Sequence, residues 1–181
     1  MLAAAVCVFA HAQSDADEFW RRLQALCGGA FEGKAVAAPP GDTTFVGKRL
    51  VMHVRECKPG EIRIPFHVGE DRSRTWVITR LADGFRLKHD HRQADGSPDA
   101  RTDYGGHTAP NTGTAGTQAF PADIQTSSLV PGANANVWTI HVEPGVRFAY
   151  SLDRQGTDRR FRIEFDLSKP VPPPPPPWGA R

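Results

Sequence analysis

From residue 31 onward, hydrophobic and polar side chains alternate with a period of two along most of the chain. Such alternation is typical of β-strands with one buried and one solvated face. The pattern predicts strands over residues 31–37, 48–57, 61–68, 74–81, 85–92, 137–143, 146–153 and 159–167. Short segments such as Lys58-Pro59-Gly60 and Ala82-Asp83-Gly84 separate them, so neighbouring strands should pair antiparallel.

About eight short strands in up-and-down order leave unpaired edges unless the sheet closes on itself. The sequence therefore predicts an all-β, mainly antiparallel fold built as an up-and-down barrel. Apolar side chains recur at helical spacing over residues 15–26, and Gly28 and Gly29 follow them. We expect an N-terminal helix there that covers one open end of the barrel.

The alternation breaks down between Asp95 and Pro131, where Gly, Thr, Pro and Asn are frequent. A loop of this length in a compact domain is usually functional or mobile. A further strand could lie in the same region, near residues 102–108 or 117–122.

Residues 1–12 form an apolar run that ends in Ala10-His11-Ala12, the small-x-small pattern of a signal peptidase site. This run is too short to span a bilayer, so we expect a signal peptide and no transmembrane segment. Export would leave Cys27 and Cys57 as an even pair in an oxidising compartment. The sequence thus predicts a periplasmic or secreted protein with one disulfide between these cysteines.

Residues 13–169 have the length of one ordinary domain, and residues 170–181 form a proline-rich tail. The tail should adopt an extended polyproline II conformation as a rigid or disordered end. The formal net charge of the chain is +2, which is too small to indicate nucleic-acid binding. The oligomeric state stays open.

The segment Phe85–Arg92 carries two histidines, His89 and His91, on the same strand face as Phe85 and Leu87. Two adjacent imidazoles that face a cavity suit a polar patch in a ligand pocket, and Tyr104 is a further candidate for this site. His67, by contrast, alternates with apolar neighbours and should lie on the barrel surface if the apolar faces point inward.

Phe31-Glu32-Gly33-Lys34, after the helix and before a meander of short strands, resembles the strand opening of the calycin group, the lipocalins and fatty-acid-binding proteins. The resemblance implies a lipocalin-like cup that holds a small, mostly apolar molecule. It also implies an arginine packed across the opening aromatic ring, and Arg160 or Arg162 would take that place.

The segment Gly84-(x4)-His89-x-His91-(x3)-Asp95 resembles the first cupin motif. That resemblance implies a divalent metal held by His89, His91 and a third histidine, either His141 or His107. A metal-bound water would then be the reactive species.

Three functions remain open from the sequence. The first is binding of a small ligand without catalysis, with His89, His91 and Tyr104 as polar anchors. The second is a metal-dependent, cupin-like enzyme, and the third is an envelope interaction module that uses the proline-rich tail. The sequence identifies no catalytic residues and no ligand.

Overall fold

The computed structural model describes residues 15–180, so the expected signal peptide lies outside the described residues. The chain is helical over residues 15–24 and then forms strands and two short helices. The strands are β1 (Ala30–Ala37), β2 (Leu50–His53), β3 (Glu56–Lys58), β4 (Glu61–Val68), β5 (Asp71–Arg80), β6 (Phe85–His91), β7 (Tyr104–His107), β8 (Thr117–Pro121), β9 (Asn136–Glu143), β10 (Arg147–Arg154) and β11 (Arg160–Val171). The short helices are α2 (Ile124–Leu129) and the 3-10 turn η1 (Ala133–Ala135). Within residues 15–180, no helix is both long and apolar enough to cross a membrane.

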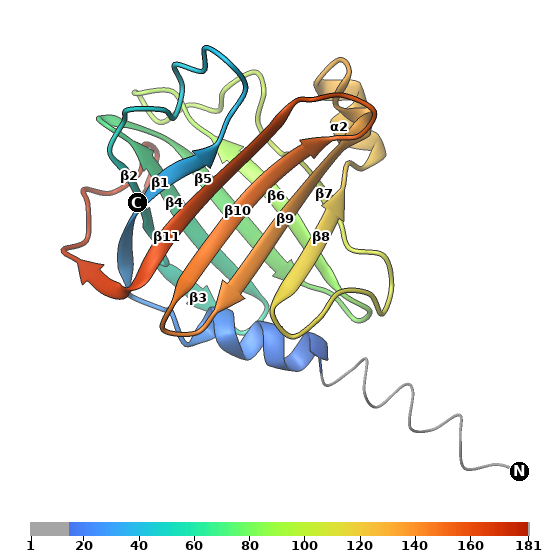
Figure 1. Cartoon of the computed structure of the whole chain (residues 1–181), viewed down its shortest axis with the longest axis horizontal. Helices are drawn as coiled ribbons and strands as arrows, with labels where there is room; N and C mark the ends of the chain where they lie inside the picture. Colours follow the sequence, from blue (N-terminus) through green and yellow to red (C-terminus); the bar gives the residue numbers. More distant parts are fainter. Residues whose placement is uncertain (1–14, 181) are drawn as a thin grey trace, which may run out of the picture.

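All strand pairs are antiparallel, and the order β7-β6-β5-β4-β2-β1-β11-β10-β9-β8 wraps into a nearly closed barrel (Figure 1). β3 pairs with β4 off this path. The prediction of a mainly antiparallel barrel with an N-terminal helix is confirmed. The barrel has more strands than expected, because β7 and β8 form in the Gly- and Thr-rich region and the predicted strand 48–57 divides into β2 and β3.

The apolar strand faces point into the barrel. Trp76 on β5 and Phe148 on β10 are separated by four strands in the sheet order, yet their ring centroids lie 6.0 Å apart. Two rings can meet in this way only across the interior of a barrel. Phe66, Tyr150 and Phe165 join them in one aromatic cluster that fills the middle of the barrel. The interior is therefore a packed core, and any cavity must lie toward an end.

The seam between β7 and β8 depends on a close backbone contact at a glycine. An isolated backbone bridge across the seam joins Gly106 to Ala122. A Cβ atom on Gly106 would lie 1.9 Å from the carbonyl oxygen of Pro121, so only glycine permits this approach. Helix α2 reinforces the seam, because the buried hydroxyl of Thr126 donates to the Gly105 carbonyl and accepts from the Gly105 N–H.

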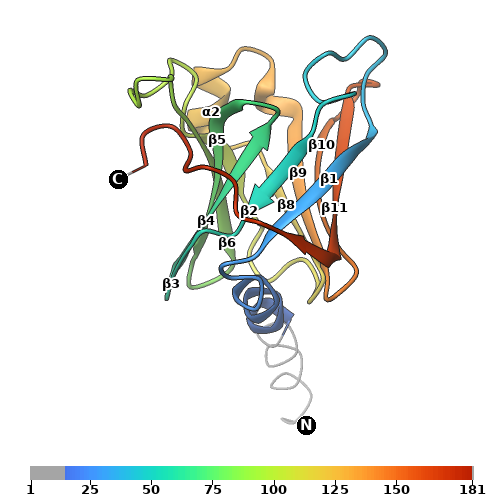
Figure 2. The ribbon, with the colours of Figure 1, turned by 90° about the vertical axis from the view of Figure 1, so that its left-hand side faces the viewer.

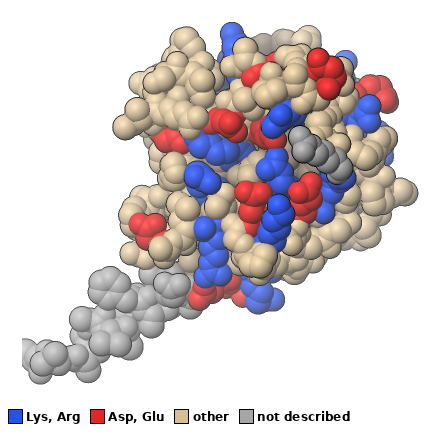
Figure 3. Space-filling model, turned by 180° about the vertical axis from the view of Figure 1, so that it is seen from behind, with Lys and Arg blue, Asp and Glu red and all other residues tan. Residues whose placement is uncertain are grey.

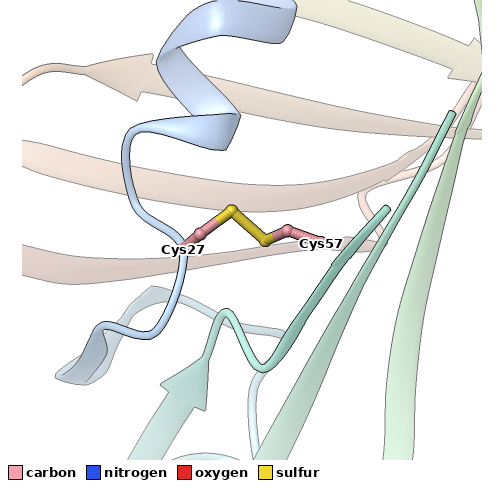
Figure 4. Close-up of a disulfide and its surroundings, with 2 residues drawn as sticks. All are labelled: Cys27 and Cys57. Carbon is pink, nitrogen blue, oxygen red and sulfur yellow. A yellow bond between two sulfur atoms is a disulfide. The ribbon is translucent and has the colours of Figure 1, made fainter. Parts of the chain in front are cut away.

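The N-terminal helix covers the end of the barrel drawn at the bottom of Figure 1. Phe19 and Trp20 pack on Phe85 at the start of β6, with ring centroids 5.2 Å and 6.0 Å apart. The predicted disulfide is present: Cys27, just after the helix, is joined to Cys57 on β3 (Figure 4). This bond fixes the covering helix to the barrel wall.

The C-terminal segment packs against the outside of the barrel. β11 continues through Val171, and residues 172–180 then cross the outer face of β2, β4 and β5 (Figure 2). The Trp178 N–H donates to the Arg72 carbonyl, and the Arg72 guanidinium donates to the Pro176 carbonyl. His67 is only 4 % exposed beneath this segment. The expectation of a surface-exposed His67 is wrong, because the C-terminal segment covers this outward-facing histidine. The tail, expected as a rigid or disordered end, packs on the barrel, and nothing local in its sequence indicates this contact.

Candidate functional site

A pocket of about 360 Å³ is lined by residues of the β1–β2 loop, of the segment after α2 and of neighbouring strand ends. Figure 1 draws this loop and α2 at the end of the barrel opposite the N-terminal helix. We call this cavity the mouth pocket. It is lined by Thr44, Phe45, His91, Asp99, Arg101, Tyr104, Val130, Ala133, Asn136, Trp138, Tyr150, Leu152, Arg154, Arg159 and Phe161. Its volume is near the lower end of the range for small-molecule sites, and many of its walls are aromatic.

The sequence-predicted residues His89, His91 and Tyr104 lie together at the floor of this pocket. His89 and Tyr104 are directly opposite on β6 and β7, and their rings stack with centroids 4.5 Å apart. The Tyr104 hydroxyl lies 3.0 Å from Nε2 of His91. His91 and Tyr104 line the pocket, whereas His89 is 3 % exposed and lies beneath them.

His89 is a neutral imidazole with a defined tautomer. Its burial lowers the pKa to about 3. Its Nδ1 lies 3.0 Å from the Tyr104 carbonyl oxygen, which can only accept a hydrogen bond, so Nδ1 carries the proton. Nε2 must then accept, and the Tyr150 hydroxyl, 2.6 Å away, donates to it. The floor is therefore a fixed chain of hydrogen bonds from the β7 backbone through His89 to Tyr150 on β10.

The two tyrosines of the floor are neutral as well. Burial raises the pKa of Tyr104 to about 12 and raises that of Tyr150 well above its usual value. Burial also lowers the pKa of His91. Near pH 7 the floor thus presents uncharged aromatic rings and hydroxyl groups to whatever enters the pocket.

The walls contain residues that sequence reasoning missed. Trp138 and Asn136 come from the start of β9, and Leu152 and Arg154 from the end of β10. Strand alternation places each of these inward, but it does not show which strand ends meet at the open mouth. The β1–β2 loop, which supplies Phe45, carried no pattern in the sequence that would have placed it there.

The proposed metal ligands are not brought together. His141 lies on the outer face of β9, with its Nδ1 2.8 Å from the Thr117 hydroxyl and its Nε2 4.0 Å from a Glu143 carboxylate oxygen. His107 is also on the outside, 3.5 Å from Asp123. Within residues 15–180, no group of three or more His, Cys, Asp or Glu side chains is arranged to hold a metal ion.

A second hollow, of about 520 Å³, lies outside the barrel between β4–β6 and the C-terminal segment. On this face positive and negative side chains are interspersed (Figure 3). The buried carboxylate of Asp90 binds Arg63 at 2.5 Å and Arg92 at 2.7 Å, so the arginines of this hollow already have partners. This arrangement explains how the tail-covered face is stabilised and gives no indication of a ligand.

The fold and the site together define an antiparallel β-barrel with a packed interior and an aromatic pocket at one mouth. Comparisons with family models, with curated proteins and with solved structures find no match. The architecture is compatible with a calycin-like fold. The arginine expected to pack across Phe31 is at neither proposed position. Arg160 and Arg162 lie opposite Asp153 and Ser151 on β10, and Arg162 bonds to Glu164 and Ser151. Phe31 lies opposite Pro170, far along β11 from both arginines.

Proposed function

We propose that this protein binds a small molecule in the mouth pocket, without catalysis. The observation that carries the proposal is the contrast between the filled barrel interior and the open, aromatic-lined mouth above a rigid floor. A largely preformed concave site with apolar walls and a few fixed polar groups is the usual form of a small-molecule site. His91 and Tyr104 would contact the ligand, and His89 would hold Tyr104 and Tyr150 in place.

The protonation states of the floor favour binding over acid–base chemistry. A general acid or base works best with a pKa near the working pH. The pKa of His89 is about 3 and that of Tyr104 about 12, so neither group exchanges protons readily near pH 7. Both are suited to hold a fixed pattern of donors and acceptors.

We also propose that the protein works in an oxidising compartment, periplasmic or extracellular. The support is the disulfide between Cys27 and Cys57, because such bonds persist mainly outside the reducing cytoplasm. A structural disulfide that closes about 31 residues is expected to stabilise the fold by about 3 to 4 kcal/mol.

The binding proposal is tested by filling the pocket. Leu152 lies at the mouth, so Leu152→Trp should occupy the space of a ligand. Val146→Trp is the matched control, because Val146 is 52 % exposed in the turn at the opposite end of the barrel. The probe is N-phenyl-1-naphthylamine, a neutral two-ring dye with an attached phenyl group, titrated against each protein by fluorescence.

We expect one dye per chain for the original protein and for Val146→Trp, and at least about 10-fold weaker binding for Leu152→Trp, since lost burial of one ring is worth more than 1.4 kcal/mol. Equal dye binding by all three proteins, or none by the original protein, would overturn the proposal. If the dye binds as expected, native mass spectrometry of the protein purified from its exported compartment, without added ligand, would identify any natural small molecule that it carries.

A further inference from the structure

The charges around the mouth pocket are unbalanced. Three arginines line it, Arg101, Arg154 and Arg159, against one acidic residue, Asp99. The Asp99 carboxylate is already engaged, because it accepts hydrogen bonds from the Arg101 N–H at 2.8 Å and from the Gln93 side chain at 2.6 Å. Among residues 15–180, none of the three arginines forms an ion pair. This is unlike the outer hollow, where Arg63 and Arg92 share Asp90.

Arg154 is held in position without being neutralised. Its Nε donates to Oδ1 of Asn136 at 2.9 Å, and Asn136 is only 5 % exposed. A neutral amide orients the guanidinium but leaves its positive charge uncompensated. The remaining N–H groups of a guanidinium can form the paired hydrogen bonds that a carboxylate or sulfonate accepts. Holding the arginine in advance also lowers the entropy lost when a ligand binds.

Aromatic surface lies beside this charge. Trp138 and Phe161 line the same pocket, and the Arg159 guanidinium carbon lies 5.5 Å from the centre of the Phe161 ring. The neutral floor below adds Tyr104 and His91. The pocket therefore combines an apolar aromatic wall, an uncharged floor and a positive rim.

We propose that the ligand is an organic anion: a compact, ring-containing apolar body with one anionic oxygen head group, whose head binds Arg154 with support from Arg159. The body would pack on Trp138 and Tyr104. This inference rests on the function proposed above and adds the chemical class of the ligand.

The experiment compares two dyes that share one body. 8-Anilinonaphthalene-1-sulfonate is N-phenyl-1-naphthylamine with a sulfonate added, so the difference in their affinities reports the head group alone. Both dyes are titrated against the original protein, Arg154→Gln and the matched control Arg160→Gln. Arg160 is an exposed arginine at the start of β11 and does not line the pocket. Thermal unfolding and the affinity for the neutral dye show whether each variant is folded.

We expect the sulfonate dye to bind at least about 10-fold more tightly than the neutral dye, because hydrogen bonds between a guanidinium and an anionic oxygen are stronger than those between neutral groups. Arg154→Gln should remove most of this advantage and leave the neutral dye unaffected, and Arg160→Gln should change neither. Equal affinity for the two dyes, or a sulfonate preference that persists in Arg154→Gln, would overturn the anion inference while the pocket-binding proposal stands. Failure of both dyes to bind would overturn both.

Discussion

The Tyr150 hydroxyl donates a hydrogen bond to Nε2 of His89 across 2.6 Å, deep in the barrel and between strands β10 and β6. These strands lie on opposite sides of the barrel wall, so this bond ties the two walls together directly beneath the mouth pocket. Both side chains are buried, with exposed fractions of 3 % for His89 and 8 % for Tyr150, and each is the polar exception in an apolar, aromatic environment.

Tyr150→Phe should therefore be destabilising although it removes a single oxygen atom. The substitution leaves Nε2 of His89 as a buried acceptor without a donor, which costs about 1 to 3 kcal/mol. Urea unfolding followed by fluorescence measures the free energy of unfolding. Tyr104→Phe is the matched control, since its hydroxyl lies 3.0 Å from Nε2 of His91, which is less buried than His89 and lines the pocket, so we expect water to take the place of this hydroxyl. A loss in Tyr150→Phe no larger than that in Tyr104→Phe would contradict this role for the bond.

The buried histidines should make the protein lose stability in mild acid. The pKa is lowered by burial to about 3 in His89 and to about 4 in His67, from 6.5 in the unfolded chain. At pH values between the lowered pKa of each folded histidine and 6.5, the unfolded state binds more protons than the folded state. The free energy of unfolding therefore rises with pH in this range. The contribution is fully present above about pH 6.5, and at pH 5 each histidine should have lost about 2 kcal/mol of it.

Urea unfolding at pH 7, 6 and 5 measures this slope. His67→Gln should flatten it, because this imidazole no longer contributes to the difference in bound protons between the unfolded and folded states. Staying at or above pH 5 avoids the carboxylates, whose ion pairs are lost at lower pH. Equal slopes in the original protein and in His67→Gln would show that burial of His67 does not shift its titration.

Much of the fold could be predicted from the sequence because strand alternation records burial directly. The paired positions of His89 and His91 on the inner face follow from that alternation alone. The rest depends on contacts between distant segments. Nothing local in the tail shows that Pro174 and Pro175 lie over His67, and nothing local shows that Arg154 meets Asn136 at the mouth. β7 was hard to recognise because Gly105 and Gly106, which allow the close backbone contact at the seam, interrupt the alternation of apolar and polar side chains.

The β7–β8 seam predicts a strong asymmetry between two glycine substitutions. Gly106→Ala places a Cβ atom 1.9 Å from the Pro121 carbonyl oxygen, which must move and break the bridge to Ala122. Such overpacking costs about 1 to 3 kcal/mol. Gly60→Ala, in the turn between β3 and β4, meets nothing within 4 Å and should change stability by less than about 0.5 kcal/mol. Hydrogen exchange should also accelerate at β7 and β8 in Gly106→Ala only. Similar unfolding free energies for the two variants would mean that the seam does not require glycine.

The C-terminal segment should behave as part of the barrel wall. A chain that ends at Val171 loses the backbone hydrogen bond of Trp178 to Arg72 and the packing of Pro174 and Pro175 over His67. Water then reaches the His67 ring, whose Nε2 has no hydrogen-bond partner among the described residues. We therefore expect the pKa of His67 to rise from about 4 toward its ordinary value, which NMR titration of the imidazole proton measures. Trp178→Ala in the full chain is the milder control and should leave that pKa nearly unchanged, because the prolines stay in place. If the truncated chain keeps the low pKa of His67, the strand environment rather than the tail buries this histidine, and the segment is free to engage another partner.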